Sequence, residues 1–168
     1  MNYRSTAIGK IINEYLTNKA DLSDKAVHLL FSANRWELEP KIRGTLEEGV
    51  TLVIDRYSYS GIAFSASKKN MSMDWCSQPE TGLPKPDLVF LLTLKPEALC
   101  RRGGFGNERY ETKETQKKVA TNFRAMQESF WKEIDADKDV DDLTEELLKH
   151  AMFYVDEVKY APLKSLWS

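Results

Sequence analysis

The sequence predicts an α/β fold in which helices cover a parallel sheet. Two runs without polar alternation, 50–54 and 88–92, are mostly β-branched or aliphatic and have the length of strands buried on both faces of a sheet. Patterns with helical periodicity precede, separate and follow these runs, and this alternation is typical of one α/β domain. Because 168 residues are enough for one well-buried domain and few for two, we expect a single domain over residues 1–168.

The composition excludes several classes of partner. Hydrophobic residues make up 42% and charged residues 30% of the chain, as in ordinary globular proteins. The net charge of -2 gives no reason to expect nucleic acid or an anionic membrane as a partner. No apolar run approaches the roughly 20 residues that span a bilayer, and the N-terminus opens into a helical pattern instead of a secretory signal. Cys76 and Cys100 lack metal-ligand spacing, so we expect a reduced, cytoplasmic protein, with the nucleus and the mitochondrion left open.

The element order follows from helical or strand periodicity and from residues that begin or end helices. In chain order, the expected elements are a helix capped by Ser5 or Thr6, a helix from Ser23 or Asp24 to Pro40, a helical stretch from there to Gly49, a strand at 50–54, a short helix around 62–64, a helical turn at 73–76, a strand at 88–92, a short helix beginning at Pro96, a helix at 112–131, an edge strand at 132–136 and a helix at 139–154. On the last helix we expect Leu143, Leu147, Leu148 and Met152 to face inward. Between 70 and 86 the composition turns to Ser, Gln, Pro and Gly, which predicts a long surface connection.

The first apolar run ends in an acid and an arginine. Ligands of open α/β sheets bind just beyond the carboxyl ends of the strands, so Asp55 and Arg56 are expected at the edge of a site. The carboxylate of Asp55 could hold a metal ion, and the guanidinium of Arg56 could hold a phosphate. The alternative is a salt bridge at the end of the strand.

Phe31 and Arg35 are four residues apart on an expected helix, so they share one of its faces. An aromatic ring beside a guanidinium can stack on a flat heterocycle and hydrogen-bond the carbonyl edge of that heterocycle. The alternative is a core phenylalanine next to an arginine that faces solvent.

The segment 101–110 combines three glycines with three arginines, and we take 101–114 as a candidate lid. A mobile lid over anionic phosphates needs the hinge freedom of glycine, positive charge and a means of excluding water. A plain surface turn is the alternative.

Four segments in order resemble the thymidylate kinase family of the eukaryotic type: 31–36, 55–61, 84–89 and 106–111. The resemblance runs from about Arg4 to Trp167. It implies a P-loop NTPase-type nucleoside monophosphate kinase fold, a parallel sheet flanked by helices. It also implies transfer of the γ-phosphoryl group of ATP, with Mg²⁺, to dTMP to give dTDP, and a homodimer as the assembly.

The resemblance also implies roles for individual residues. Asp55 and Arg56 would be catalytic, with Asp55 near Mg²⁺, while Phe31 would stack on thymine and Arg35 would bond a thymine carbonyl, supported by Gln116. The others would be Arg4 and Arg56 on the acceptor phosphate, Ser60, Gly61 and Phe64 along the pocket, Arg109 and Tyr110 at the lid and the sugar, and Arg102, Ala136, Asp137 and Lys138 on the ATP side.

The chain departs from the family pattern at its start. The family opens with a strand and a phosphate-binding loop of the pattern G-x-x-x-x-G-K-[ST], and the only Gly-Lys here, Gly9-Lys10, lies in a helical pattern. The chain therefore resembles the family without its N-terminal quarter, its first strand and its P-loop. The alternatives are another nucleotide kinase, and an inactive variant that binds dTMP or dimerises with a full-length kinase.

Overall fold

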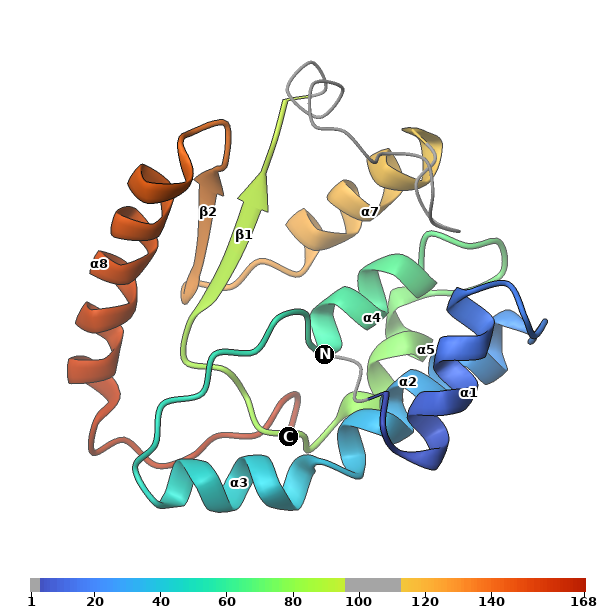
Figure 1. Ribbon diagram of the computed structural model, residues 1–168, viewed down its shortest axis with the longest axis horizontal. Coiled ribbons are helices and arrows are strands. Elements are labelled where there is room, and N and C mark those ends of the chain that lie inside the picture. Colours follow the sequence, from blue (N-terminus) through green and yellow to red (C-terminus); the bar gives the residue numbers. More distant parts are fainter. Residues whose placement is uncertain (1–3, 96–112) are drawn as a thin grey trace. The chain divides into compact units, whose positions relative to one another are not determined.

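The computed structural model describes residues 4–95 and 113–168, which divide into two compact units (Figure 1). The described part of the first unit comprises residues 4–84, 113–126 and 165–168, and that of the second comprises residues 85–95 and 127–164. The short helix expected at Pro96 and most of the candidate lid lie outside the described residues. The expectation of a single folding domain stays a prediction.

In the described part of the first unit the named elements are all helices. Its elements are α1 (Ala7–Leu16), α2 (Asp24–Trp36), α3 (Glu39–Glu47), α4 (Ser58–Ser65), α5 (Met73–Ser77), the 3₁₀ turn η1 (Gln78–Glu80) and α7 (Lys113–Ala125). The predicted caps are confirmed, because Thr6 Oγ1 accepts a hydrogen bond from the Gly9 amide at 3.0 Å and Ser23 Oγ accepts one from the Ala26 amide at 3.4 Å. Gly49, with φ +77°, follows the end of α3 as expected.

Helix α2 contacts α1, α3, α4 and η1. Four of its side chains, His28, Ser32, Arg35 and Trp36, bond to the segment 76–80, and we call them the α2 polar row. His28 Nε2 lies 2.9 Å from the Cys76 carbonyl oxygen, so Nε2 carries the proton and Nδ1 accepts from the Ser65 hydroxyl at 2.8 Å. The row fastens the connection 70–86 to α2, although the composition of that connection predicts a surface segment.

The predicted strand at 50–54 is wrong. These residues are assigned to neither strand nor helix, and no strand pairs with them in the part of the chain that the structure describes. A strand needs the backbone of a neighbour to satisfy its amides and carbonyls, and apolar character alone does not provide one. Val53, which the prediction buries, is 95% exposed.

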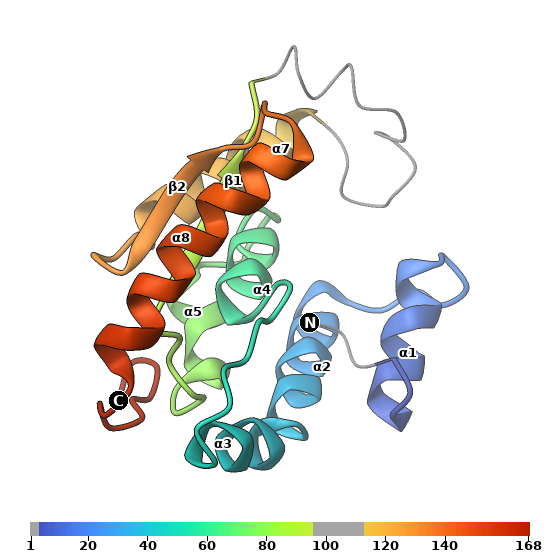
Figure 2. The same ribbon diagram turned by 60° about the vertical axis from the view of Figure 1, so that its left-hand side comes forward.

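The second unit contains a parallel pair of strands, β1 (Val89–Thr93) and β2 (Trp131–Asp135), in register from Val89↔Trp131 to Thr93↔Asp135. Helix α8 (Val140–Val158) runs along this sheet (Figure 2), with the His150 ring 6.4 Å from the Phe90 ring and Lys132 over the Tyr154 ring. Two predicted strands and the final helix are thus confirmed, with small shifts of their ends.

Two details of the helical predictions are wrong. Leu148 and Met152 are exposed on α8, because the residues that reach the sheet, His150 and Tyr154, lie on another stripe of the helix. Helix α7 ends at Ala125 and not near Trp131, because the Met126 amide bonds to the Phe123 carbonyl in a tighter turn that stops the helix. Among the described residues no helix is both long and apolar enough to cross a membrane.

The buried His28 makes stability depend on pH. Burial lowers its pKa more than the hydrogen bond to Cys76 raises it. In the unfolded chain the ring takes up a proton near pH 6.5, so the stability that neutral His28 contributes is complete above that pH and is lost as the pH falls.

We therefore expect the urea midpoint of the wild-type chain to fall between pH 7.5 and pH 5.5 by more than that of His28→Gln. The variant is less stable at pH 7.5 but has a flatter pH profile. His150→Gln, which removes the other histidine, is the control and should keep the wild-type slope. If the urea midpoints of wild type and His28→Gln fell equally with pH, the buried neutral His28 would not be the cause of the pH dependence.

Candidate functional site

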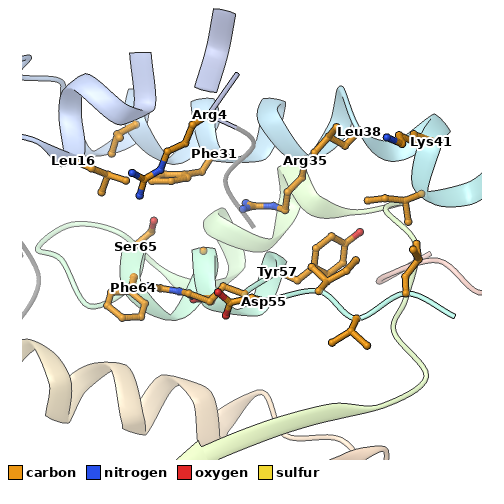
Figure 3. A pocket seen from close by; sticks show the side chains of 18 of the residues that line it. Arg4, Leu16, Phe31, Arg35, Leu38, Lys41, Asp55, Tyr57, Phe64 and Ser65 are labelled. Carbon is orange, nitrogen blue, oxygen red and sulfur yellow. The ribbon is translucent and has the colours of Figure 1, made fainter. Parts of the chain in front are cut away.

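A cavity of about 770 Å³ lies in the first unit (Figure 3). Its volume is within the range of small-molecule sites. Eight of the residues singled out from the sequence line it: Arg4, Phe31, Arg35, Asp55, Arg56, Ser60, Gly61 and Phe64. Figure 3 shows Arg4, Phe31 and Arg35 along one wall, and Asp55, Tyr57 and Phe64 along the other. The structure thus brings together residues up to 60 positions apart in sequence, Arg4 and Phe64 being the outermost.

The cavity suits an anionic ligand. Among the described residues its charged lining is mostly positive, with Arg4, Arg35, Lys41, Arg56 and Lys68 against one carboxylate, Asp55. Clustered positive charge raises the local concentration of anionic ligands. Lys41 and Lys68 were not singled out from the sequence, since isolated lysines carry no signal of a site.

Arg56 is held at the start of α4. Its Nε donates to Ser60 Oγ at 2.9 Å, and its guanidinium carbon lies 4.6 Å from the centre of the Phe64 ring. Its φ of +59° is a conformation that residues other than glycine rarely adopt, and such strained positions cluster at functional sites. Asp55 is exposed at the cavity wall and forms no ion pair with any described residue, which contradicts the alternative of a strand-end salt bridge.

Arg35 is 3% exposed and pairs with Glu80, whose side chain is 0% exposed. Nε donates to Glu80 Oε2 at 2.8 Å and Nη2 donates to Oε1, so the pairing is bidentate. The alternative of an arginine facing solvent is therefore wrong. Sequence reasoning missed Glu80, because a single acid in a Pro- and Gly-rich connection has no pattern that indicates a buried partner.

Gly61 lies against the same guanidinium. A Cβ at position 61 would be 2.8 Å from Arg35 Nη2 and 3.3 Å from Nη1. A flexible side chain could move away, but here Glu80 holds the guanidinium from the other side. Any larger residue at position 61 therefore has to displace a buried ion pair.

Tyr57 is a further cavity residue that the sequence reasoning did not single out. Its hydroxyl is buried and makes no hydrogen bond with a described residue, and burial raises its pKa far above the usual range. Tyr57 thus keeps its proton and is a hydrogen-bond donor. Figure 3 shows the ring on the wall with Asp55, with its hydroxyl directed toward Leu38 and Lys41.

Other predicted residues lie elsewhere. Gln116, on α7, is half-buried and does not line the cavity. Ala136, Asp137 and Lys138 belong to the second unit, where the Ala136 amide bonds to the Thr93 carbonyl at 2.8 Å and Lys138 pairs with Glu146. Arg102, Arg109 and Tyr110 lie outside the described residues. The roles assigned to all of these residues stay predictions.

Comparison with known proteins identifies relatives along nearly the whole chain. The family model described as "Thymidylate kinase" matches residues 2–147. Thymidylate kinase of Homo sapiens is 45% identical over 167 residues, which cover 98% of this chain and 79% of that protein, and the Danio rerio enzyme is 42% identical with the same coverage. A solved structure of thymidylate kinase from Candida albicans superposes with a TM-score of 0.86 at 38% identity, covering 98% of this chain and 83% of the other. The predicted α/β nucleotide kinase fold, with a parallel sheet flanked by helices, is thereby confirmed.

The Arg35–Glu80 pair predicts an unequal response to two similar substitutions. Arg35→Ala leaves the buried Glu80 carboxylate without its partner, so we expect a loss of about 3–5 kcal/mol in the free energy of unfolding. Arg43→Ala removes the partner of Glu39 in a partly exposed pair on α3, where the N–O distance is 2.6 Å, and should cost less than about 1 kcal/mol. Urea unfolding of both variants measures this, and equal losses would contradict the burial of the pair.

Proposed function

Since the chain belongs to the thymidylate kinase family, we propose that its cavity binds dTMP as the acceptor of a phosphoryl group from ATP. The observation that carries the proposal is the combination of groups on the cavity wall. Phe31 and the Arg35–Glu80 pair supply an aromatic face and hydrogen-bond donors, while Arg56, Arg4 and the lysines supply positive charge. A nucleoside monophosphate needs both kinds of group on the protein, because it carries a flat heterocycle at one end and a phosphate dianion at the other.

At the base end, Phe31 stacks on thymine and Arg35 donates to a thymine carbonyl. Arg35 is held by Glu80 and lies against Gly61, so it is positioned before the ligand arrives. A donor that is already fixed loses little freedom on binding.

At the phosphate end, Arg56 and Arg4 bind the dTMP phosphate. The Arg56 guanidinium is steadied by Ser60 and by the Phe64 ring, and Arg4 Nη1 donates to Asn13 Oδ1 at 3.1 Å. Guanidinium groups match phosphate oxygens in charge and in fork geometry. In the reaction an acceptor-phosphate oxygen bonds to the γ-phosphorus of ATP, the bond from that phosphorus to the bridging oxygen breaks, and ADP leaves.

The cavity offers Mg²⁺ one suitable carboxylate ligand, Asp55. No group of three metal-ligating side chains occurs among residues 4–95 and 113–168, but Mg²⁺ usually takes only one or two carboxylates together with substrate phosphates. The exposed Asp55 carboxylate, next to Arg56, is a suitable single ligand. When bound, the ion would neutralise charge on the transferring phosphoryl group.

The remaining assignments of the proposal rest on the family. They are ATP contacts from Arg102, Ala136, Asp137 and Lys138, substrate contacts from Arg109, Tyr110 and Gln116, a homodimer and a cytoplasmic location.

An observation on the sequence supports a second candidate function, dTMP binding without catalysis. The printed residues contain no G-x-x-x-x-G-K-[ST], whose backbone amides and lysine hold ATP phosphates, so a chain of these residues alone could bind dTMP without phosphorylating it.

Thymidylate binding is the direct test of the cavity. We expect calorimetric titration with dTMP to show saturable binding, and Phe31→Leu to weaken it about tenfold, because base–aromatic stacking is worth about 1–3 kcal/mol. Phe153→Leu, at an exposed position of α8, is the matched control and should bind as wild type does. Equal affinities of Phe31→Leu and wild type would remove Phe31 from the base site.

A kinase assay of the 168-residue chain distinguishes phosphorylation of dTMP from binding of dTMP without catalysis. Losing one donor to a transition-state oxyanion costs about a hundred- to a thousandfold in rate, and the P-loop pattern supplies several such donors. We therefore expect little or no ADP release from Mg-ATP and dTMP in a coupled assay with this 168-residue chain. Turnover near one per second, ordinary for an enzyme, would show that other residues do the work of the P-loop.

A further inference from the structure

We propose that Glu80 is a positioning residue that determines which ligand group Arg35 accepts. Because Glu80 neutralises most of its charge, Arg35 presents a fork of N–H donors that is nearly neutral. This fork selects an uncharged carbonyl group of the ligand. Anionic groups of the ligand bind to the other cationic side chains of the cavity. This inference rests on the proposed function and extends it to the specificity of the base end.

The geometry of the pair leaves one edge of the guanidinium available. Glu80 takes the Nε–H and one hydrogen of Nη2, which are two of the five N–H donors of arginine. Of the other three, one on Nη1 and one on Nη2 lie along the edge between these nitrogens, and the third points from Nη1 toward the Cδ side. This guanidinium makes no further hydrogen bond within the described part of the chain. Figure 3 shows Arg35 extending from α2 with its guanidinium in the cavity, on the side of Phe31.

A second contact confines the same group. The Gly61 backbone lies so close to the guanidinium that a methyl group there would collide with Nη2 and make a tight contact with Nη1. Glu80 on one edge and Gly61 beside the terminal nitrogens therefore fix the direction of the free fork. An arginine confined in this way selects by geometry as well as by charge.

The charge of the pair decides what the fork accepts. Both side chains are almost fully buried, so solvent screens them little and the carboxylate cancels most of the guanidinium charge. Arg4 and Arg56 also line the cavity, and among the described residues Glu80 is the only fully buried carboxylate. Glu80 thus makes Arg35 a nearly neutral donor among cationic side chains, and this difference orients a ligand that carries both a carbonyl and a phosphate.

The ligand class follows from the donors. A 4-oxo pyrimidine presents a carbonyl oxygen to the fork and is accepted. A 4-amino pyrimidine places N–H groups against N–H groups and is rejected, since both sides then lack acceptors.

The experiment compares three probes by calorimetric titration: dUMP, dCMP and inorganic phosphate. dUMP and dCMP differ at the 4-position without the added methyl group of dTMP. We expect the wild-type chain to bind dUMP at least tenfold more tightly than dCMP. In Glu80→Gln the ratio should fall below threefold, and phosphate should bind at least threefold more tightly, because Arg35 regains its charge. A merely structural role for Glu80 would weaken all three probes together and would overturn the proposal.

Control variants complete the design. Glu39→Gln breaks the comparable pair with Arg43 on α3 and should leave both the ratio and the phosphate affinity unchanged. Glu80→Asp keeps the charge and should retain most of the discrimination. If circular dichroism shows that Glu80→Gln does not fold, Gly61→Ala, inside helix α4, tests the fork from the other side and should lower the ratio at least fivefold.

The outcomes separate this inference from the proposed function. A wild-type chain that binds neither nucleotide refutes both. A wild-type chain that binds dUMP and dCMP equally leaves the cavity as a nucleotide site but overturns the role of the fork. An unchanged ratio in folded Glu80→Gln or Gly61→Ala overturns the role of Glu80 alone.

Discussion

The ion pair between Arg35 and Glu80 is the interaction on which the first unit and its cavity depend. It joins α2 to the 3₁₀ turn η1, 45 residues further along the chain. Two opposite charges at 3% and 0% exposure are stable only together, because either one alone would be left in a region of low polarity. Arg35 of this pair forms part of the cavity wall, so its guanidinium contributes both to the stability of the fold and to the shape of the site.

The rest of the α2 polar row extends this arrangement along the helix. His28, Ser32 and Trp36 bond to the carbonyls of Cys76 and Pro79, while the apolar Val27 is buried on the same helix. His28 also accepts from Ser65, a residue of the cavity lining on α4. Helix α2 therefore fixes both the connection behind it and the helix across the cavity from it, which explains how a wall built from separate segments keeps one shape.

Sequence alone predicts the local features and misses those that depend on distant partners. Helix caps at Thr6 and Ser23 are recognisable because the capping side chain and the amide it bonds are three residues apart. Eight residues of the cavity lining were found from the sequence, some through short motifs such as Asp55-Arg56 and the others through the family resemblance. The strand at 50–54 was mispredicted because pairing requires a neighbour that apolar periodicity does not identify. Glu80 was missed because its burial is decided by an arginine far away in sequence.

The bonds to Pro79 have a consequence for how this junction tolerates substitution. Ser32 Oγ and Trp36 Nε1 converge on one backbone carbonyl oxygen, at 2.9 and 2.7 Å. Every amino acid carries that oxygen, so any residue that keeps the backbone path at 79 preserves both acceptor contacts. The donors have no such latitude, since each is a particular side-chain group on α2. At this contact the residue identities that matter are therefore those of Ser32 and Trp36 on α2. Substitutions at position 79 that keep the backbone path leave both hydrogen bonds in place.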